Sequence, residues 1–491
     1  MIFRTKTSGY AARAFPSRRF VRSALCEAMF CAAALLVAMP APAFAQGERP
    51  DGPSGIAADA FVDPHDIVQL GDKLVFSAFH PDRGVVVWIT DPSTGSTELL
   101  TEPPGDFHGL FPSGLTVYKG RVYFSCDDNV HGFQLWSTDG TKAGTRLFKT
   151  FYTGTGGSAP SAFTVYDDTL FFAAKDSARG YTLWKTSGDP ASTVPVRGAE
   201  GLLTPGHLTV AGRKMFFTAV DSAHGNELWV MDSANGAPRL VKDIRPGRED
   251  SLPTKLTAAN GLLFFSATDG QHGWELWKSD GTASGTTMVK DIRPGVDASR
   301  PDSLASVGRW LFFSADDGTH GSQLWRSDGT DIGTAMVKAI RPGREGAAVG
   351  RITAVADKAF FAAFDGVHGL ELWKSDGTEA GTAMVKDINP GAESALPDVL
   401  TSFGTRLVFA AADAEHARQQ PWVTDGTEAG TRVLLDTTPG QSYERPSTFV
   451  PVGNGALAFS AEDAKANQRL WILEPSGKLH LVGSPLTVKI R

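Results

Sequence analysis

The octapeptide Glu275-Leu276-Trp277-Lys278-Ser279-Asp280-Gly281-Thr282 decides the fold, because the chain repeats it. Close copies stand at Gln323–Thr330 and Glu371–Thr378. The tryptophan of this motif recurs along the 491 residues in steps of 45 to 49 residues. A period of about 40–50 residues is typical of a propeller or a solenoid array. The nine tryptophans in register are Trp88, Trp136, Trp184, Trp229, Trp277, Trp325, Trp373, Trp422 and Trp471; Trp274 and Trp310 lie outside it.

One unit, taken from Leu252 to Asp297, has the pattern of four short strands. Asn260-Gly261 is a strong hairpin signal between the first two of them. The continuous apolar run that follows suits a strand covered on both faces. Asp269–Gly273 and Asp280–Thr282 are expected to be turns. The predicted strands are Lys255–Ala259, Leu262–Ala267, Glu275–Lys278 and Thr287–Ile292.

Four antiparallel strands within one repeat make a propeller blade. We therefore predict an all-β chain in which residues 64–491 form a single β-propeller of four-stranded antiparallel blades. Nine anchors predict nine blades; eight blades with one unit serving as a cap is the alternative. No segment has the 3.6-residue apolar period of a helix, which excludes a helical repeat. Leu486–Ile490 could supply a strand that closes the ring.

The core is expected to lie between the blades. A pair of phenylalanines accompanies the tryptophan in the consensus units, as in Phe264-Phe265. Packed sheet faces bury such side chains, at about 1.5–3 kcal/mol each. Lys290-Asp291 and its copies place charges on the expected outermost strand, where charges discourage pairing with other chains.

Residues 1–45 have the pattern of a secretory signal peptide. An arginine-rich start is followed by the apolar stretch Ala28–Met39 and by Ala43-Phe44-Ala45, a small-x-small cleavage site. The apolar stretch is shorter than the roughly 20 residues that a transmembrane helix needs, so no transmembrane segment is predicted. We expect an exported protein, in the periplasm, at the cell surface or outside the cell. Residues 46–63 are a Gly/Pro-rich lead.

Composition narrows the range of partners. With 42% hydrophobic and 21% charged residues, the chain is an ordinary globular protein. Its net charge is −7 and the repeats hold no basic cluster, so no nucleic-acid partner is expected. Removal of the signal peptide leaves Cys126 as the single cysteine, so we expect no internal disulfide, and we expect a monomer.

The units resemble the bacterial ELWxxDGT repeat family, which is named for the motif at Glu275–Thr282. Its usual continuation is matched by Gly381-Thr382, Val385–Ile388 and Pro390-Gly391. The resemblance runs from Pro64 to Val482 and implies an exported, β-propeller-like repeat protein of environmental bacteria. The family brings no established enzymatic activity, so the resemblance implies the fold and export and leaves the function open.

A repeated Asp-x-x-His-Gly sequence between the second and third strands is the most suggestive polar set. Asp and His are metal ligands and acid–base residues, but a catalytic site needs one constellation rather than a copied dipeptide. Three interpretations stay open: Asp caps a turn, the loops form a distributed binding ring, or they hold a metal or catalytic site. The candidate binding histidines are His131, His224, His272, His320 and His368.

Two further features bear on ligands. Calcium loops need several oxygen ligands, whereas Asp280-Gly281-Thr282 has one carboxylate; a structural turn is favoured there over calcium, and neither a cofactor nor a metal is predicted. Trp274 is added to the candidate binding residues, because it would lie on the face that carries the Asp-x-x-His loops and could stack a sugar or an aromatic group.

No catalytic residue is predicted. The sequence lacks the common nucleophile, metalloprotease and nucleotide-binding motifs, and nothing in it places the off-repeat acids Asp297, Asp302 and Glu393 together. The leading hypothesis is a non-enzymatic binding or scaffold protein for a protein or carbohydrate partner. The alternative is a hydrolase or oxidoreductase with its site at the mouth of the central channel.

Overall fold

The structure is a computed structural model that describes residues 61–102, 109–127, 130–152, 154, 156–416, 418–434, 443–453 and 455–482. All of them belong to one compact unit, Ala57–Arg491. The predicted signal peptide, most of the predicted lead and the predicted closing strand Leu486–Ile490 lie outside the described residues. The first strand begins at Val62, two residues before the predicted start of the propeller.

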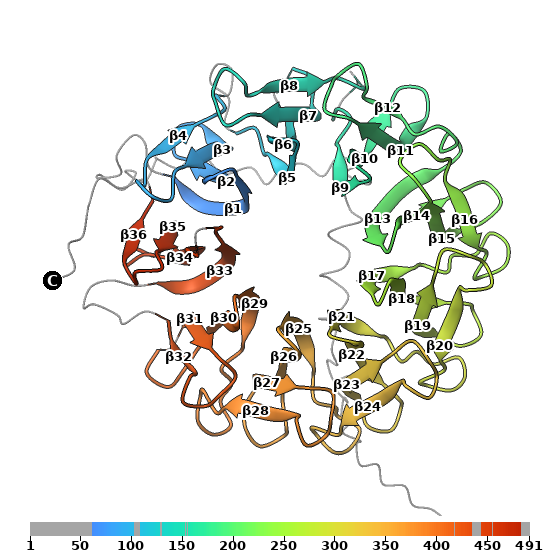
Figure 1. The fold of residues 1–491 in the computed structure, drawn as a ribbon, viewed down its shortest axis with the longest axis vertical. Coiled ribbons are helices and arrows are strands. Elements are labelled where there is room, and N and C mark those ends of the chain that lie inside the picture. Colours follow the sequence, from blue (N-terminus) through green and yellow to red (C-terminus); the bar gives the residue numbers. More distant parts are fainter. Residues whose placement is uncertain are drawn as a thin grey trace, which may run out of the picture. The chain divides into compact units, whose positions relative to one another are not determined.

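The described residues form nine four-stranded antiparallel sheets, the blades, and contain no helix (Figure 1). Each blade takes four consecutive strands, and the nine blades form a ring with the first strand of each on the inside (Figure 1). The predicted all-β propeller with nine blades is confirmed, and the alternative of eight blades is wrong.

The strands of blades 1 to 5 have the following bounds. Blade 1 is β1 (Val62–Leu70), β2 (Lys73–His80), β3 (Gly84–Thr90) and β4 (Thr97–Leu99). Blade 2 is β5 (Ser113–Tyr118), β6 (Arg121–Asp127), β7 (Phe133–Thr138) and β8 (Arg146–Lys149). Blade 3 is β9 (Ser161–Tyr166), β10 (Thr169–Asp176), β11 (Gly180–Thr186) and β12 (Val194–Pro195). Blade 4 is β13 (Leu203–Ala211), β14 (Lys214–Val220), β15 (Asn226–Met231) and β16 (Arg239–Lys242). Blade 5 is β17 (Thr254–Ala259), β18 (Leu262–Thr268), β19 (Trp274–Ser279) and β20 (Thr287–Lys290).

The remaining blades repeat this plan. Blade 6 is β21 (Asp302–Val307), β22 (Trp310–Asp316), β23 (Ser322–Ser327) and β24 (Ala335–Lys338). Blade 7 is β25 (Gly350–Val355), β26 (Lys358–Ala363), β27 (Glu371–Ser375) and β28 (Ala383–Lys386). Blade 8 is β29 (Asp398–Phe403), β30 (Arg406–Ala411), β31 (Gln420–Thr424) and β32 (Arg432–Val433). Blade 9 is β33 (Glu444–Pro451), β34 (Leu457–Glu462), β35 (Gln468–Leu473) and β36 (Leu479–Leu481).

Antiparallel pairing gives the ring two different faces. The turns between first and second strands and between third and fourth strands lie together, and we call this side the turn face. The loops between second and third strands, which carry Asp-x-x-His, lie on the other side with the connectors between blades. We call that side the loop face.

The core lies between neighbouring blades, as predicted. Phe265 and Trp277 of blade 5 pack with Phe216 and Leu228 of blade 4 in one buried cluster. Trp277 is 5% exposed and Phe265 fully buried. Seven of the other clusters likewise draw on two or more neighbouring blades, so each blade depends on its neighbours for burial.

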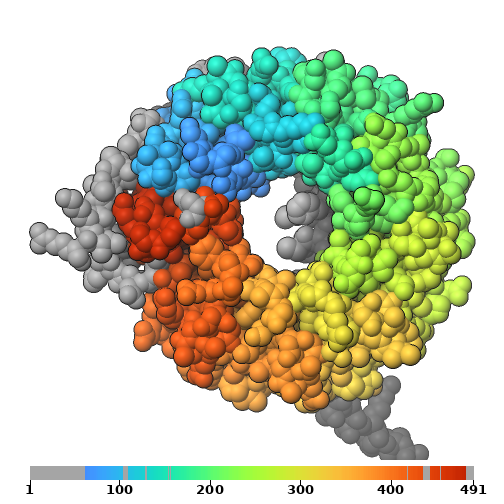
Figure 2. Space-filling view, viewed as in Figure 1, coloured from blue at the N-terminus to red at the C-terminus, as the bar shows by residue number. Residues whose placement is uncertain are grey.

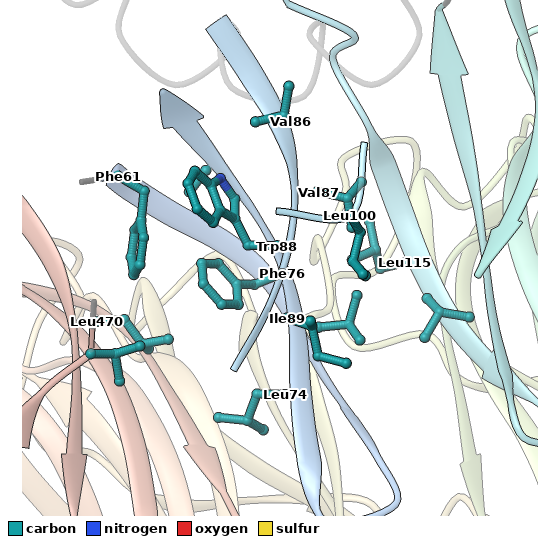
Figure 3. Packing of buried hydrophobic residues seen from close by; sticks show 14 of the residues in the cluster. Phe61, Leu74, Phe76, Val86, Val87, Trp88, Ile89, Leu100, Leu115 and Leu470 are labelled. Atoms are coloured by element: carbon teal, nitrogen blue, oxygen red, sulfur yellow. The ribbon is translucent and has the colours of Figure 1, made fainter. Parts of the chain in front are cut away.

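The ring closes by packing between blades 1 and 9 within the described residues. Phe61 lies 4.9 Å from Phe76 and 5.3 Å from Trp88 between ring centroids, with Leu470 of β35 in the same cluster (Figure 3). The guanidinium of Arg469 donates to the Phe61 carbonyl at 2.5 Å. Because both blades take four consecutive strands, no strand is exchanged between the ends of the described chain.

Lysines link each of blades 2 to 7 to the blade that follows it. Lys278 and Lys374 of the third strands donate to the carbonyls of Gly329 and Gly426 in the following blades, at 2.7 and 2.6 Å. The fourth-strand lysine of the repeat does the same: Lys290 donates to the carbonyl and the carboxylate of Asp331 at 3.2 and 3.0 Å. The charge expected to protect the outer edge therefore also forms an inter-blade contact.

The Ser-Asp-Gly-Thr turn is closed by its own hydrogen bonds. In blade 7, Asp376 Oδ1 accepts the backbone N–H and the hydroxyl of Thr378 at 2.8 and 2.7 Å. The Thr378 hydroxyl in turn accepts the N–H of Gly381 at 2.9 Å. A Cβ at position 381 would lie 2.1 Å from Asp376 Oδ1, which explains why the repeat keeps Gly there.

We expect Gly381→Ala to destabilise the protein by roughly 1–3 kcal/mol, because the new methyl group displaces the Asp376 carboxylate from its two donors. Urea unfolding monitored by circular dichroism checks this. Gly201→Ala is the control, since a Cβ there meets nothing within 4 Å. Equal stability of the two variants would contradict the account.

Candidate functional site

The Asp-x-x-His loops are turns capped by their aspartates. Asp269 Oδ1 accepts the N–H groups of Gln271 and His272 at 2.8 and 2.9 Å, and Asp269 Oδ2 lies 2.7 Å from His272 Nδ1. The hydrogen bond with the carboxylate raises the pKa of His272. The same pairs occur as His224–Asp221 at 3.0 Å, His320–Asp317 at 2.7 Å, His368–Asp365 at 2.8 Å and His416–Asp413 at 2.7 Å.

The remaining loops depart from this pattern. In blade 3, the guanidinium of Arg179 takes the place of the imidazole and donates to Asp176 Oδ2 at 2.9 Å. The carbonyl of His131 accepts a hydrogen bond from Gln134 at 2.8 Å, and the partner expected for His131, Asp128, lies outside the described residues. The capping role predicted for Asp is thus confirmed where the loop is described in full.

The glycine after each histidine allows the connector to approach. A Cβ on Gly273 would lie 2.5 Å from the carbonyl oxygen of Asp297, and one on Gly369 would lie 2.0 Å from that of Glu393. The loop and the connector are therefore in backbone contact on the loop face. Among the described residues, no three His, Cys, Asp or Glu side chains gather in a group that could hold a metal ion.

A buried Glu or Gln anchors this connector, and the sequence reasoning missed it. Glu275 is fully buried at the start of β19. Its Oε2 accepts the N–H of Ile292 at 3.1 Å, and its Oε1 accepts the N–H of Ser299 at 3.0 Å. Because Ile292 leaves the sheet to make this bond, β20 ends at Lys290 rather than at the predicted Ile292. The equivalents are Gln134, Glu227, Gln323, Glu371 and Gln420.

Glu in some blades and Gln in others accept hydrogen bonds from the connector, although only Glu can carry a charge. Gln323 Oε1 accepts the N–H of Ile340 at 3.0 Å, and its amide donates to the carbonyls of His320 and Arg341 at 2.8 and 2.7 Å. Burial raises the pKa of Glu227, Glu275 and Glu371 to about 7. The sequence signal was Glu or Gln at the first place of the octapeptide in six of the nine repeats.

A second missed feature is a ring of nine equivalent positions at the loop-face end of the inner strands, of which eight are exposed and one, Ala159, is half-buried. In blade 5 the position is Leu252, whose φ is 47°, in the left-handed region that L-residues seldom adopt. All nine equivalents have φ between 41° and 55°, and eight precede a buried proline. These mouth residues are Asp63, Phe111, Ala159, Thr204, Leu252, Arg300, Ala348, Leu396 and Arg445.

The mouth residues lie at the ends of the inner strands, and these strands surround the central opening of the ring (Figure 1 and Figure 2). Their backbone conformation is constant, whereas their side chains are acidic, basic, aromatic, aliphatic or polar. The repeat therefore holds one backbone geometry at this position and varies the side chain that it carries. The sequence signal was the proline that recurs with the spacing of the tryptophans.

Exposed apolar side chains gather on the same face. Of the thirteen exposed large hydrophobic residues in the described chain, nine lie in the loops, connectors or strand ends of the loop face. These nine are Phe79, Phe111, Val130, Leu203, Leu252, Trp274, Val296, Val367 and Leu396. The four others, at the turn-face ends of strands or in a turn, are Val117, Val165, Val194 and Ile332.

Two of the three off-repeat acids, Asp297 and Asp302, are held in separate ion pairs. Asp302 binds Lys255 of the neighbouring inner strand at 3.1 Å, and Asp297 binds Arg293 of its own connector at 3.0 Å. Asp398 forms a further pair between inner strands, with Arg351 at 2.7 Å. Each of these carboxylates thus has its own cation.

The two tryptophans outside the register have different surroundings. Trp274 is 39% exposed on the loop face at the start of β19. Trp310 lies on the turn face, where the guanidinium carbons of Arg309 and Arg326 approach its ring centroid to 4.6 and 4.1 Å. The structure therefore accounts for Trp310 by cation–π packing and leaves Trp274 open to solvent.

Comparisons with known proteins give distant likenesses. No model of a protein family and no curated protein matches this chain. Among solved structures it is similar to puromycin hydrolase, with 14% identity over 82% of this chain and 59% of that chain and a TM-score of 0.41. A prolyl endopeptidase gives 11% identity over 84% and 55%, with a TM-score of 0.41. The chain spans less than two thirds of these proteins, and likenesses this distant say nothing of its function.

We expect the buried glutamates to make stability depend on pH. A pKa raised from 4.5 to about 7 means that the folded state holds the proton more tightly than the unfolded chain does. The contribution is present in full below pH 4.5 and is lost as pH rises through 7, by up to about 3 kcal/mol for each Glu.

Urea unfolding of the Glu275→Gln variant between pH 5 and pH 8 measures this contribution. The variant should lose less stability than the unmodified protein as pH rises, because the Gln amide has no proton to lose in this range. Gln fits this place, since Gln323 occupies it in blade 6. The matched variant Gln323→Glu should lose more. Identical pH profiles for all three proteins would contradict the assignment.

Proposed function

We propose that this chain is an exported, non-enzymatic β-propeller that serves as a binding or scaffold protein for a protein or glycan partner, and that the partner binds the loop face. The ELWxxDGT resemblance and the pattern of residues 1–45 support export. We place the binding surface on the loop face because nine exposed apolar side chains lie there. Exposed apolar groups that gather on one side of a protein mark interaction sites.

The arrangement of polar groups supports binding over catalysis. The aspartates of the loops accept hydrogen bonds from their own turns, as Asp269 does from Gln271 and His272. The carboxylates of Asp302 and Asp398 at the inner strands are neutralised by Lys255 and Arg351. Groups held in this way position backbone and fix the surface on which a partner would dock.

Export has a direct test. We expect the mature protein to begin at Gln46, because the predicted cleavage site precedes it. Mass spectrometry of the N-terminal peptide, from protein expressed with its full leader in a bacterial host, measures this. Recovery of an uncleaved leader from the cytoplasm would contradict export.

The binding surface is tested by comparing its two faces. The purified protein is screened on printed arrays of peptides and oligosaccharides, and the bound probes are titrated against single variants. We expect Leu252→Asp and Leu396→Asp on the loop face to weaken binding at least about tenfold, because contacts at the centre of an interface dominate its energy. Ile332→Asp and Val194→Asp are the turn-face controls and should bind normally.

Two results would overturn this proposal. Equal losses from variants of both faces would remove the loop face as the site. Chemical turnover of a bound probe, detected by chromatography after prolonged incubation, would replace the binding role with an enzymatic one.

A further inference from the structure

Trp274 and Arg300 stand next to each other on the loop face. The N–H of Arg300 donates to the carbonyl of Trp274 at 3.1 Å, and the Ser299 hydroxyl donates to the same carbonyl at 3.4 Å. Trp274 begins β19, and Arg300 is the mouth residue of the connector that leads to blade 6. Both side chains are exposed.

Neither side chain has a polar partner within the described residues. The guanidinium of Arg300 makes no hydrogen bond or ion pair there, and the indole N–H of Trp274 makes no hydrogen bond. Some loop-face arginines are paired, such as Arg293 with Asp297 and Asp316, and Arg418 with Glu444. Arg248 of another connector, like Arg300, makes no ion pair within the described residues. What sets Arg300 apart is its backbone bond to an exposed indole, and its guanidinium is available for an anionic ligand.

The combination occurs once in the ring. The backbone bond that joins Arg300 to Trp274 recurs between Leu252 and Asn226, between Leu396 and Leu370, and between Arg445 and Gln419. None of those pairs combines an aromatic ring with a cation. The scaffold therefore repeats, while this chemistry is specific to the junction of blades 5 and 6.

The backbone of the pair is preorganised. Arg300 is held at a φ of 50° ahead of the buried Pro301. Its position follows the connector that Glu275 fixes through Ser299 and Ile292. A site whose backbone is already in place loses less entropy when a ligand binds.

We propose that Trp274 and Arg300 form a binding site for an acidic saccharide, a sugar that carries a carboxylate. The indole offers a flat face for the apolar side of the sugar ring, and the guanidinium can bind the carboxylate through two hydrogen bonds. This inference rests on the proposed function and names the chemistry of its glycan partner.

The surroundings favour a saccharide over an acidic peptide. The residues that occupy the place of Trp274 in the adjacent blades are Asn226 and Ser322, which are polar. Protein interfaces need a contiguous buried centre of aromatic and apolar side chains. The indole thus has polar residues at the equivalent places on both sides, and these can bind the hydroxyl groups of a sugar ring stacked on it.

The test uses tetragalacturonate as the probe and its methyl ester as the matched neutral probe. Titration followed by tryptophan fluorescence and by calorimetry should show binding of the acid and at least tenfold weaker binding of the ester. Trp274→Ala and Arg300→Ala should each weaken binding of the acid at least tenfold, and Arg300→Lys should weaken it less, because lysine keeps the charge but loses the two-point geometry.

Controls separate the site from general effects. Arg248→Ala, at an exposed arginine of another connector, and Trp310→Ala, on the turn face, should bind as the unmodified protein does. Thermal unfolding of each variant shows that it is folded, since both substituted residues are exposed.

Four results would overturn the inference: no binding of tetragalacturonate, equal binding of its methyl ester, full binding by both Trp274→Ala and Arg300→Ala, or tighter binding of hexaglutamate at the same two residues. If any of these occurs while an array probe still binds the loop face, the proposed function stands and the acidic saccharide is wrong. If no array probe binds the loop face either, both fall.

Discussion

Each blade has two apolar faces that only a neighbouring blade can cover. Phe265 and Trp277 of blade 5 are buried against Phe216 of blade 4, and the same contact recurs around the ring. A single blade cannot bury this surface alone, so the stable object is the closed array. Phe61, Trp88 and Leu470 pack together where the ring closes, so the first and last blades also cover each other's apolar faces.

Close contacts within each repeat also decide where the chain can vary. Glycines such as Gly381 and Gly273 are required because a side chain would meet another atom within 2.1 to 2.5 Å. The buried Glu275 or its Gln equivalents fix each connector. The mouth residues follow this fixed connector and point away from the core, which frees them to differ between blades.

The Asp–His pairs of the loops recur in several blades, whereas the pair of Trp274 and Arg300 does not. The Asp269–His272 pair and its copies are explained by the hydrogen bonds of the turn itself. The pair of Trp274 and Arg300 occurs once and has no such internal explanation in the described residues. The features that recur between blades are therefore explained by the fold, and we place the proposed recognition at an exposed feature that a single blade junction possesses.

The sequence by itself determined the repeat and the strand order within a blade, and its nine anchors predicted nine blades with eight as the alternative. These follow from local physics: Asn260-Gly261 makes a hairpin, apolar runs make strands, and the tryptophan returns once per blade. The same local reasoning located the capped turns at Asp269 and Asp280.

Only the tertiary structure decided what the side chains contact. A Glu in a strand gives no sign from its neighbours that it is buried, because Ile292 and Ser299 reach Glu275 from 17 and 24 residues away. Likewise, Trp274 and Arg300 are 26 residues apart and become adjacent only when the connector folds back across the loop face. Local patterns specify strands and turns, whereas a site made by two distant segments depends on how the blades pack.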